Sequence, residues 1–171
     1  MEISDIETSR LKLRPLNESD WKMVSFLRSD KQVNKFINRP IADTKETAIA
    51  FISKINTGIK TNEWYYWAIE LKASNTVIGT ICLWNFSDDG KVAETGFDLH
   101  PNFQGNGFMS EALQSILDFG FEQLQLNTIL AFTHFENINA QRLLKQHKFK
   151  KSNNTTESNN AIRYLLKNTI V

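Results

Sequence analysis

Cysteine, proline and net charge are all scarce in this sequence. Its 171 residues include one cysteine, Cys82, and three prolines, and the formal net charge is only +1. A single cysteine excludes an internal disulfide, and a near-neutral chain has no general electrostatic field that attracts nucleic acid or an anionic membrane. We therefore expect neither nucleic acid nor a membrane as a partner.

Long apolar runs and targeting segments are missing as well. No run approaches the roughly 20 apolar residues that a membrane-spanning helix requires, and the first residues lack the charged and then apolar pattern of a secretory signal. The cysteine and the histidines are not spaced as a metal-ligand cluster. These absences predict a cytoplasmic protein without a metal site.

The chain is rich, however, in apolar residues that can form a core. Hydrophobic residues make up 41% of the sequence, which includes four Trp and twelve Phe. A chain of this length buries one core and hardly two, so we expect residues 1–171 to form one domain. Nothing in the composition decides the oligomeric state, and a homodimer is one of the possibilities.

Hydrophobic periodicity predicts strands and helices in alternation, and hence an α/β fold class. The stretches with the alternating or β-branched pattern of strands are residues 6–16, 64–71, 76–86, 92–99, 127–134 and 161–171. Those with the spacing of amphipathic helices are residues 21–27, 33–37, 48–55 and 109–124. The helix before residues 127–134 predicts that this strand runs parallel to the preceding one.

Local signals refine these boundaries. Polar links at 72–75 and 87–90 predict the turns of an antiparallel meander. Two pairs are predicted to cap helices, Asn17 with Asp20 and Asp43 with Glu46. Residues 152–160 are expected to form a polar loop.

A glycine-containing stretch between a strand and a helix is the most informative part of the sequence. It runs from His100 to Ala112 and follows the strand-like residues 92–99. Gly105 and Gly107 let the backbone approach a ligand, and the first N–H groups of the next helix point towards it. This arrangement predicts a site for a phosphate or pyrophosphate, although two glycines alone are equally compatible with an ordinary turn.

The same stretch resembles a known family. Gln104-Gly-Asn-Gly-Phe-Met109 is similar to the Gln-x-x-Gly-x-(Gly/Ala) acyl-CoA signature of the GNAT N-acetyltransferases. The wider context from Glu94 to Ala112, and the opening Thr8-Ser-Arg-Leu-Lys-Leu-Arg14, resemble the branch that includes the N-terminal acetyltransferases of ribosomal proteins. Met109 stands where Gly or Ala is usual, which changes the shape of the site but not its backbone hydrogen bonds.

This resemblance implies a fold, an activity and a set of site residues. The implied fold is a mixed seven-stranded sheet with helices on both faces and a splay between strands four and five, which receives the pantetheine arm. The implied activity is transfer of acetyl from acetyl-CoA to a primary amine, on a peptide N-terminus or a small molecule. The residues implied to bind the cofactor are Leu99, His100, Gln104, Gly105, Asn106, Gly107, Phe108, Met109 and Asn137.

A second segment, residues 135–149, is also similar to the family but departs from it in detail. Asn137 matches the family's Asn, whereas Lys148 stands at a usual Gly and Leu144 where several members have a Tyr general acid. The type and position of Asn137 suit a helix N-cap equally well, and the two roles are compatible. The missing Tyr keeps an alternative function open, a CoA-binding sensor with weak or no turnover.

Acetyl transfer to an amine also needs a base. Strand alternation places Glu94, Asp98 and His100 on one side of their strand. Glu94 occupies the position of a Glu frequent in this branch and is the first candidate for the base, directly or through water. A purely structural carboxylate, bonded to backbone, is the alternative for Glu94, and His134 is a weaker candidate for the base.

Overall fold

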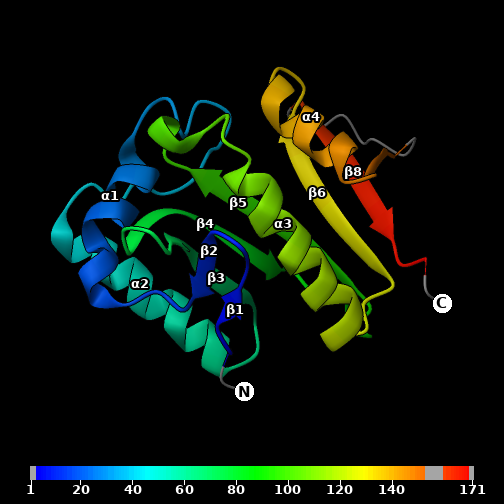
Figure 1. The fold of residues 1–171 in the computed structure, drawn as a ribbon, viewed down its shortest axis with the longest axis horizontal. Helices are drawn as coiled ribbons and strands as arrows, with labels where there is room; N and C mark the ends of the chain where they lie inside the picture. Colours follow the sequence, from blue (N-terminus) through cyan, green and yellow to red (C-terminus); the bar gives the residue numbers. More distant parts are fainter. Residues whose placement is uncertain (1–2, 153–159, 170–171) are drawn as a thin grey trace.

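The computed structural model describes residues 3–152 and 160–169, which contain one eight-stranded mixed sheet (Figure 1). The strand order is β1-β2-β3-β4-β5-β6-β8-β7. The strands are β1 (Ile6–Glu7), β2 (Leu11–Arg14), β3 (Tyr65–Leu71), β4 (Thr76–Trp84), β5 (Val92–Leu99), β6 (Thr128–His134), β7 (Lys150–Lys151) and β8 (Ala161–Lys167). The predicted α/β class and mixed sheet are confirmed.

The predicted count of seven strands was wrong. The N-terminal stretch forms two short antiparallel strands, because the chain turns back between Glu7 and Leu11. Lys150 and Lys151 form the additional edge strand β7 on β8. Most of the predicted polar loop at 152–160 lies outside the described residues.

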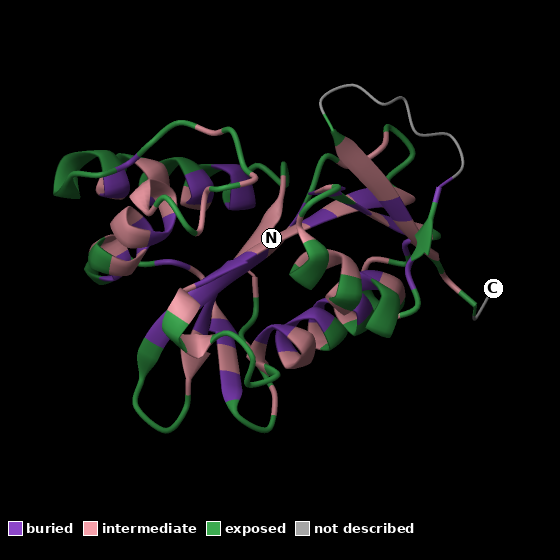
Figure 2. Ribbon diagram, turned by 90° about the horizontal axis from the view of Figure 1, so that it is seen from above, coloured by how far each residue is buried: buried purple, intermediate pink, exposed green. Residues whose placement is uncertain are grey.

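Two pairs of helices cover opposite faces of the sheet (Figures 1 and 2). Trp67 and Ala68 are neighbours on β3 yet belong to different core clusters, so the clusters lie on opposite faces. No helix among the described residues is long and apolar enough to cross a membrane. The helices are α1 (Trp21–Ser29), α2 (Lys45–Lys60), α3 (Phe108–Asp118) and α4 (Ile138–Gln146).

The apolar stripe of α3 packs on one face and those of α1 and α2 on the other. On α3 this stripe includes Leu113 and Ile116, which have no exposed surface. Burial of one such side chain contributes about 1.5–3 kcal/mol. On the opposite face, Ile52 of α2 is 1% exposed and packs in a cluster with Val24 of α1.

The helix starts agree in part with the sequence. Asn17 and Asp20 form the predicted capping box, which leads through a short 3-10 turn into α1. The predicted cap at Asp43 was wrong, because Thr44 exchanges hydrogen bonds with Thr47 and begins α2 one residue later. Residues 33–37, predicted to be helical, do not form a helix, because residues 33–36 lie in turns and residue 37 has no regular structure.

The splay predicted in the middle of the sheet is present between β5 and β6. Their parallel pairing runs from Val92 opposite Thr128 to Thr95 opposite Ala131, and then ends. The N–H of His100 donates to the carbonyl of Ile78 on β4 at 2.8 Å. Because N–H directions alternate along a strand, the N–H of Leu99 points to the other side, into the splay.

Candidate functional site

The glycine loop, residues 100–107, connects the splayed end of β5 to α3. Gly105 and Gly107 both have a φ of 77°, which a residue with a side chain adopts only with strain. Gly107 is the N-cap of α3, and the first intrahelical bond runs from the N–H of Glu111 to its carbonyl. The N–H groups of the first helical turn therefore remain available at the loop.

A glutamine side chain ties this loop to the strand. The Nε2 of Gln104 donates to the carbonyl of Leu99 at 3.1 Å. This bond fixes the loop against the end of β5, where the N–H of Leu99 enters the splay. The predicted residues Leu99 and Gln104 to Met109 are therefore contiguous in space as well as in sequence.

Arg10, in the turn between β1 and β2, holds the glycine loop from the other side. Its Nη1 donates to the carbonyl of Asn106 at 2.9 Å, and its guanidinium carbon lies 4.4 Å from the ring centroid of Phe108. A Cβ on Gly107 would lie 3.4 Å from Nη2 of Arg10. A Cβ at Gly107 would therefore be in van der Waals contact with the arginine, and the positive φ is the main obstacle to a side chain there.

Glu111 anchors this arginine. Its Oε2 lies 2.7 Å from Nε of Arg10, while Oε1 accepts hydrogen bonds from the Thr8 hydroxyl at 2.6 Å and the Arg10 N–H at 2.8 Å. Partial burial opposes ionisation, but these hydrogen bonds outweigh it and lower the pKa of Glu111. Sequence reasoning missed Arg10, although Arg10 belongs to the opening motif that carried the family resemblance.

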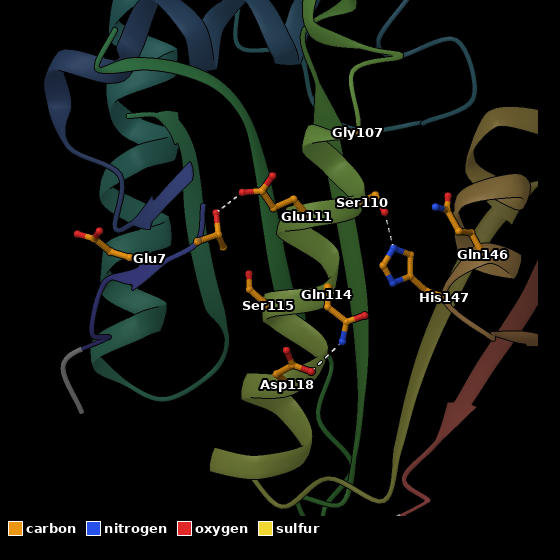
Figure 3. Close-up of a pocket in the computed structure, with 10 residues that line it drawn as sticks. Glu7, Gly107, Ser110, Glu111, Gln114, Ser115, Asp118, Gln146 and His147 are labelled. Carbon is orange, nitrogen blue, oxygen red and sulfur yellow. Dashed lines mark hydrogen bonds between the residues drawn. The ribbon is translucent and has the colours of Figure 1, made fainter. Parts of the chain in front are cut away.

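A surface cavity of about 680 Å³ lies along α3 and is lined by residues of the helix from Ser110 to Asp118 (Figure 3). Within it, the Ser110 hydroxyl and Nε2 of His147 are 2.8 Å apart. Burial lowers the pKa of His147, and the Asp118 carboxylate opposes this effect. His147 was also missed, because nothing in the sequence pairs it with a residue 37 positions away.

Glu94, Asp98 and His100 lie on one face of β5, which we call the acceptor face because the sequence predicts the base there. Glu94 accepts a hydrogen bond from Nδ2 of Asn85 at 2.7 Å and lies opposite Trp84 on β4. The alternative role for Glu94, a structural carboxylate, predicted a bond to the backbone. The observed partner is instead the side-chain amide of Asn85. Glu94 lies in the half of β5 that is still paired with β6, where it is opposite Leu130.

Asp98 is 9% exposed and fully bonded. Its Oδ1 accepts from the Thr80 hydroxyl at 2.6 Å, which in turn lies 3.0 Å from the Tyr66 hydroxyl. Its Oδ2 lies 2.7 Å from Nη1 of Arg39. Burial first, and then the charge of Asp98, raise the pKa of Tyr66, so the phenol stays neutral.

The imidazoles of His100 and His134 are both held by aromatic neighbours. His100 stacks on Phe26 of α1 with centroids 4.3 Å apart, and its Nδ1 accepts from the Asn102 N–H. His134 stacks on Phe36, from the segment between α1 and α2, with centroids 5.1 Å apart. Phe36 thus connects the α1–α2 segment with the far side of the splay.

Residues 135–149, the second segment that resembles the family, serve the fold as a helix cap and as part of the core. Asn137 is the N-cap of α4 and accepts from the Ala140 N–H at 3.2 Å. Leu144 is 1% exposed and belongs to the same core cluster as Leu113 and Ile116 of α3. Lys148 follows the end of α4 with a φ of 65°.

Comparisons with known proteins agree with this geometry. The profile of the family described as an acetyltransferase (GNAT) domain matches residues 10–150. The uncharacterized N-acetyltransferase YnaD of Bacillus subtilis (strain 168) is 33% identical over 82% of this chain and 79% of its own. The uncharacterized N-acetyltransferase p20 of Bacillus licheniformis is 36% identical over 84% of this chain and 81% of its own.

Solved structures share the fold. RimL, a ribosomal L7/L12 alpha-N-protein acetyltransferase in complex with coenzyme A, superposes with a TM-score of 0.84. The match covers 96% of this chain and 98% of that chain at 17% sequence identity. RimL and this chain therefore share one fold, the GNAT fold that the sequence-based resemblance implied.

Proposed function

The chain belongs to the GNAT acetyltransferase family and is an N-acetyltransferase, and from this premise we propose that it transfers the acetyl group of acetyl-CoA to a primary amine. The observation that carries the proposal is the glycine loop at the splayed end of β5. There the N–H of Leu99 lies at one end of the loop and the helical N–H groups of α3 at the other, and we propose that the cofactor follows the path between them.

The proposed contacts to acetyl-CoA follow this path. Backbone N–H groups from Gly105 to Met109 suit the pyrophosphate, and Asn106 is held in place by Arg10. The N–H of Leu99 suits an acyl or pantetheine carbonyl. We also propose that His100 and Asn137 contact the cofactor. The N–H and Nδ1 of His100 are already bonded within the fold, which leaves its Nε2. The Oδ1 of Asn137 is likewise bonded, which leaves its Nδ2. Bound acetyl-CoA supplies an activated thioester, as it does throughout the family.

Glu94 is the proposed base. It lies on the acceptor face, five residues before Leu99, which corresponds to about 16 Å along an extended strand. This separation excludes direct contact between Glu94 and an amine near Leu99, so proton transfer between them would need a chain of several water molecules. The hydrogen bond from Asn85 orients the carboxylate, and its second oxygen has no hydrogen-bond partner among the described residues.

The inactive sensor is not favoured, because the relatives of this chain are named N-acetyltransferases. We propose a cytoplasmic location and an acceptor that is either a peptide N-terminus or a small amine. The test is acceptor profiling with purified protein and acetyl-CoA, with thiol release as the measurement. Absence of thiol release with every peptide and amine, while coenzyme A still binds, would contradict the proposed activity.

A further inference from the structure

Arg28, on α1, is a half-buried cation without a counter-ion. Its guanidinium packs over the ring of Phe51 with 4.0 Å between the guanidinium carbon and the centroid. Its Nη2 donates to the carbonyl of Pro40 at 3.0 Å, but its Nε is buried and has no hydrogen-bond partner among the described residues. In that same part of the chain, no carboxylate lies within ion-pair distance of Arg28.

The nearby charges are already committed to other partners. Arg39 bonds to Asp98, to the Asn34 side chain and to the carbonyl of Leu27. Asp98 uses one oxygen for Arg39 and the other for the Thr80 hydroxyl. Burial first, and then the neighbouring charge of Arg39, lower the pKa of Arg28. A guanidinium that is partly removed from water and has no counter-ion is costly in free energy unless a bound anion pairs with it.

Arg28 lies at the acceptor end of the site. Arg28 donates to the carbonyl of Pro40, and the preceding residue, Arg39, bonds to Asp98, which directly precedes Leu99 on β5. His100, on the other side of Leu99, stacks on Phe26 of the same helix as Arg28. The guanidinium is therefore positioned beside the strand end where the proposed acyl group would be bound.

We propose that Arg28 binds a carboxylate of the acceptor, so that the preferred acceptors are amines that also carry a carboxylate. Nη1, which has no hydrogen-bond partner among the described residues, and the second N–H of Nη2 form the planar end of the guanidinium and match the two oxygens of a carboxylate. This proposal rests on the proposed acetyl transfer, because it assumes that an amine reaches the acceptor face. The carboxylate can come from a free amino acid or from an acidic residue next to a peptide N-terminus.

The test compares matched acceptors with and without the carboxylate. One arm pairs glycine, β-alanine and 4-aminobutanoate with their amides, and the other pairs Gly-Asp-amide with Gly-Asn-amide. With acetyl-CoA and the full chain, we expect kcat/KM to favour the carboxylate member of at least one pair by about tenfold or more. The arm that shows the preference identifies the source of the carboxylate.

Arg28→Gln should abolish this preference, Arg28→Lys should retain part of it, and Lys22→Gln on the same helix should leave it unchanged. Unchanged stabilisation by coenzyme A shows that each variant is folded. Equal kcat/KM within all pairs, unaffected by Arg28→Gln, would overturn the proposal. A melting-temperature shift by the carboxylate member that requires Arg28, without any thiol release, would support acceptor binding and contradict only the proposed activity.

Discussion

Arg10 and Glu111 form an ion pair, 2.7 Å between Nε and Oε2, that joins the β1–β2 turn to the first turn of α3. The same guanidinium bonds to the carbonyl of Asn106 inside the glycine loop. Two segments separated by 101 positions therefore fix the loop conformation together. We infer that the N-terminal turn contributes to cofactor affinity without touching the cofactor.

Arg10→Ala is expected to raise the Kd for acetyl-CoA by about tenfold, because the loop loses the charge-assisted bonds that hold its N–H groups in place. The side chain is 44% exposed, so the direct cost in folding free energy should be small. Isothermal titration calorimetry measures the affinity. Lys12→Gln, which removes an exposed ion pair with Asp5 nearby, is the matched control and should leave the Kd unchanged.

Gly107→Ala is expected to abolish the rise in melting temperature that acetyl-CoA produces. The added Cβ is strained at a φ of 77° and lies 3.4 Å from Nη2 of Arg10. Gly90→Ala is the control, since Gly90 has a φ of 66° but nothing within 4 Å of an added Cβ. Both variants should lose about 1 kcal/mol of stability. If both also lost the acetyl-CoA shift, the shift would not depend specifically on the glycine loop.

Lys148→Gly is expected to raise the free energy of unfolding by about 0.5–1 kcal/mol. Lys148 has a φ of 65° just after α4, where its N–H and that of Phe149 close the helix end onto Lys145 and Leu144. Urea denaturation measures the change. Lys145→Gly, inside α4, should instead destabilise by about 1 kcal/mol, and equal signs for the two would refute the assignment.

The same segment shows what the sequence predicts and what it leaves undetermined. Alignment with the family placed a usual glycine at Lys148, and the positive φ explains why glycine is usual there. Asn137 was equally compatible with cofactor contact and an N-cap, and the structure shows the cap. Side-chain type and spacing define local geometry, but they do not distinguish a ligand contact from a bond to the backbone.

The opening motif illustrates a second limit. It contains Arg10 and Arg14, which the sequence presents as similar members of one strand pattern. Arg14 is bonded to Asp20 and Glu70 within the fold, whereas Arg10 reaches the glycine loop. These partners are between 6 and 96 positions away, so they depend on the tertiary arrangement rather than on periodicity.

Cys82 is expected to react slowly with iodoacetamide in the native protein at pH 8. Burial raises the pKa of its thiol to about 12, so almost no thiolate is present. Urea-unfolded protein, with a thiol pKa near 8.5, should react much faster. Equal alkylation rates in the two states, followed by mass spectrometry, would show that Cys82 is not held as a buried thiol.

The raised pKa also predicts a pH dependence of stability. The thiol of Cys82 ionises near pH 8.5 in the unfolded chain but stays neutral in the folded chain at that pH. Its contribution to the free energy of unfolding is therefore fully present below pH 8.5 and is lost as the pH rises towards 12. Cys82→Ala should flatten the decrease measured by urea denaturation between pH 8 and 10.

Glu94→Gln is expected to lower kcat/KM by about 100-fold at neutral pH while the Kd for acetyl-CoA stays the same. A base acting through water removes the proton from an ammonium acceptor, so the deficit should shrink as pH rises and solvent deprotonates the amine. Glu136→Gln, an exposed carboxylate beside His134, is the control and should retain full activity.

The alkaline side of the same profile tests whether the chain has a general acid. Leu144 is buried and cannot protonate the leaving thiol, but a thiol with a pKa of about 8.5 needs little assistance. We therefore expect wild-type kcat to rise with pH to a plateau. Leu144→Tyr should overpack the core and lower stability rather than increase the rate. A falling alkaline limb that disappears in His134→Gln would instead identify His134 as an acid.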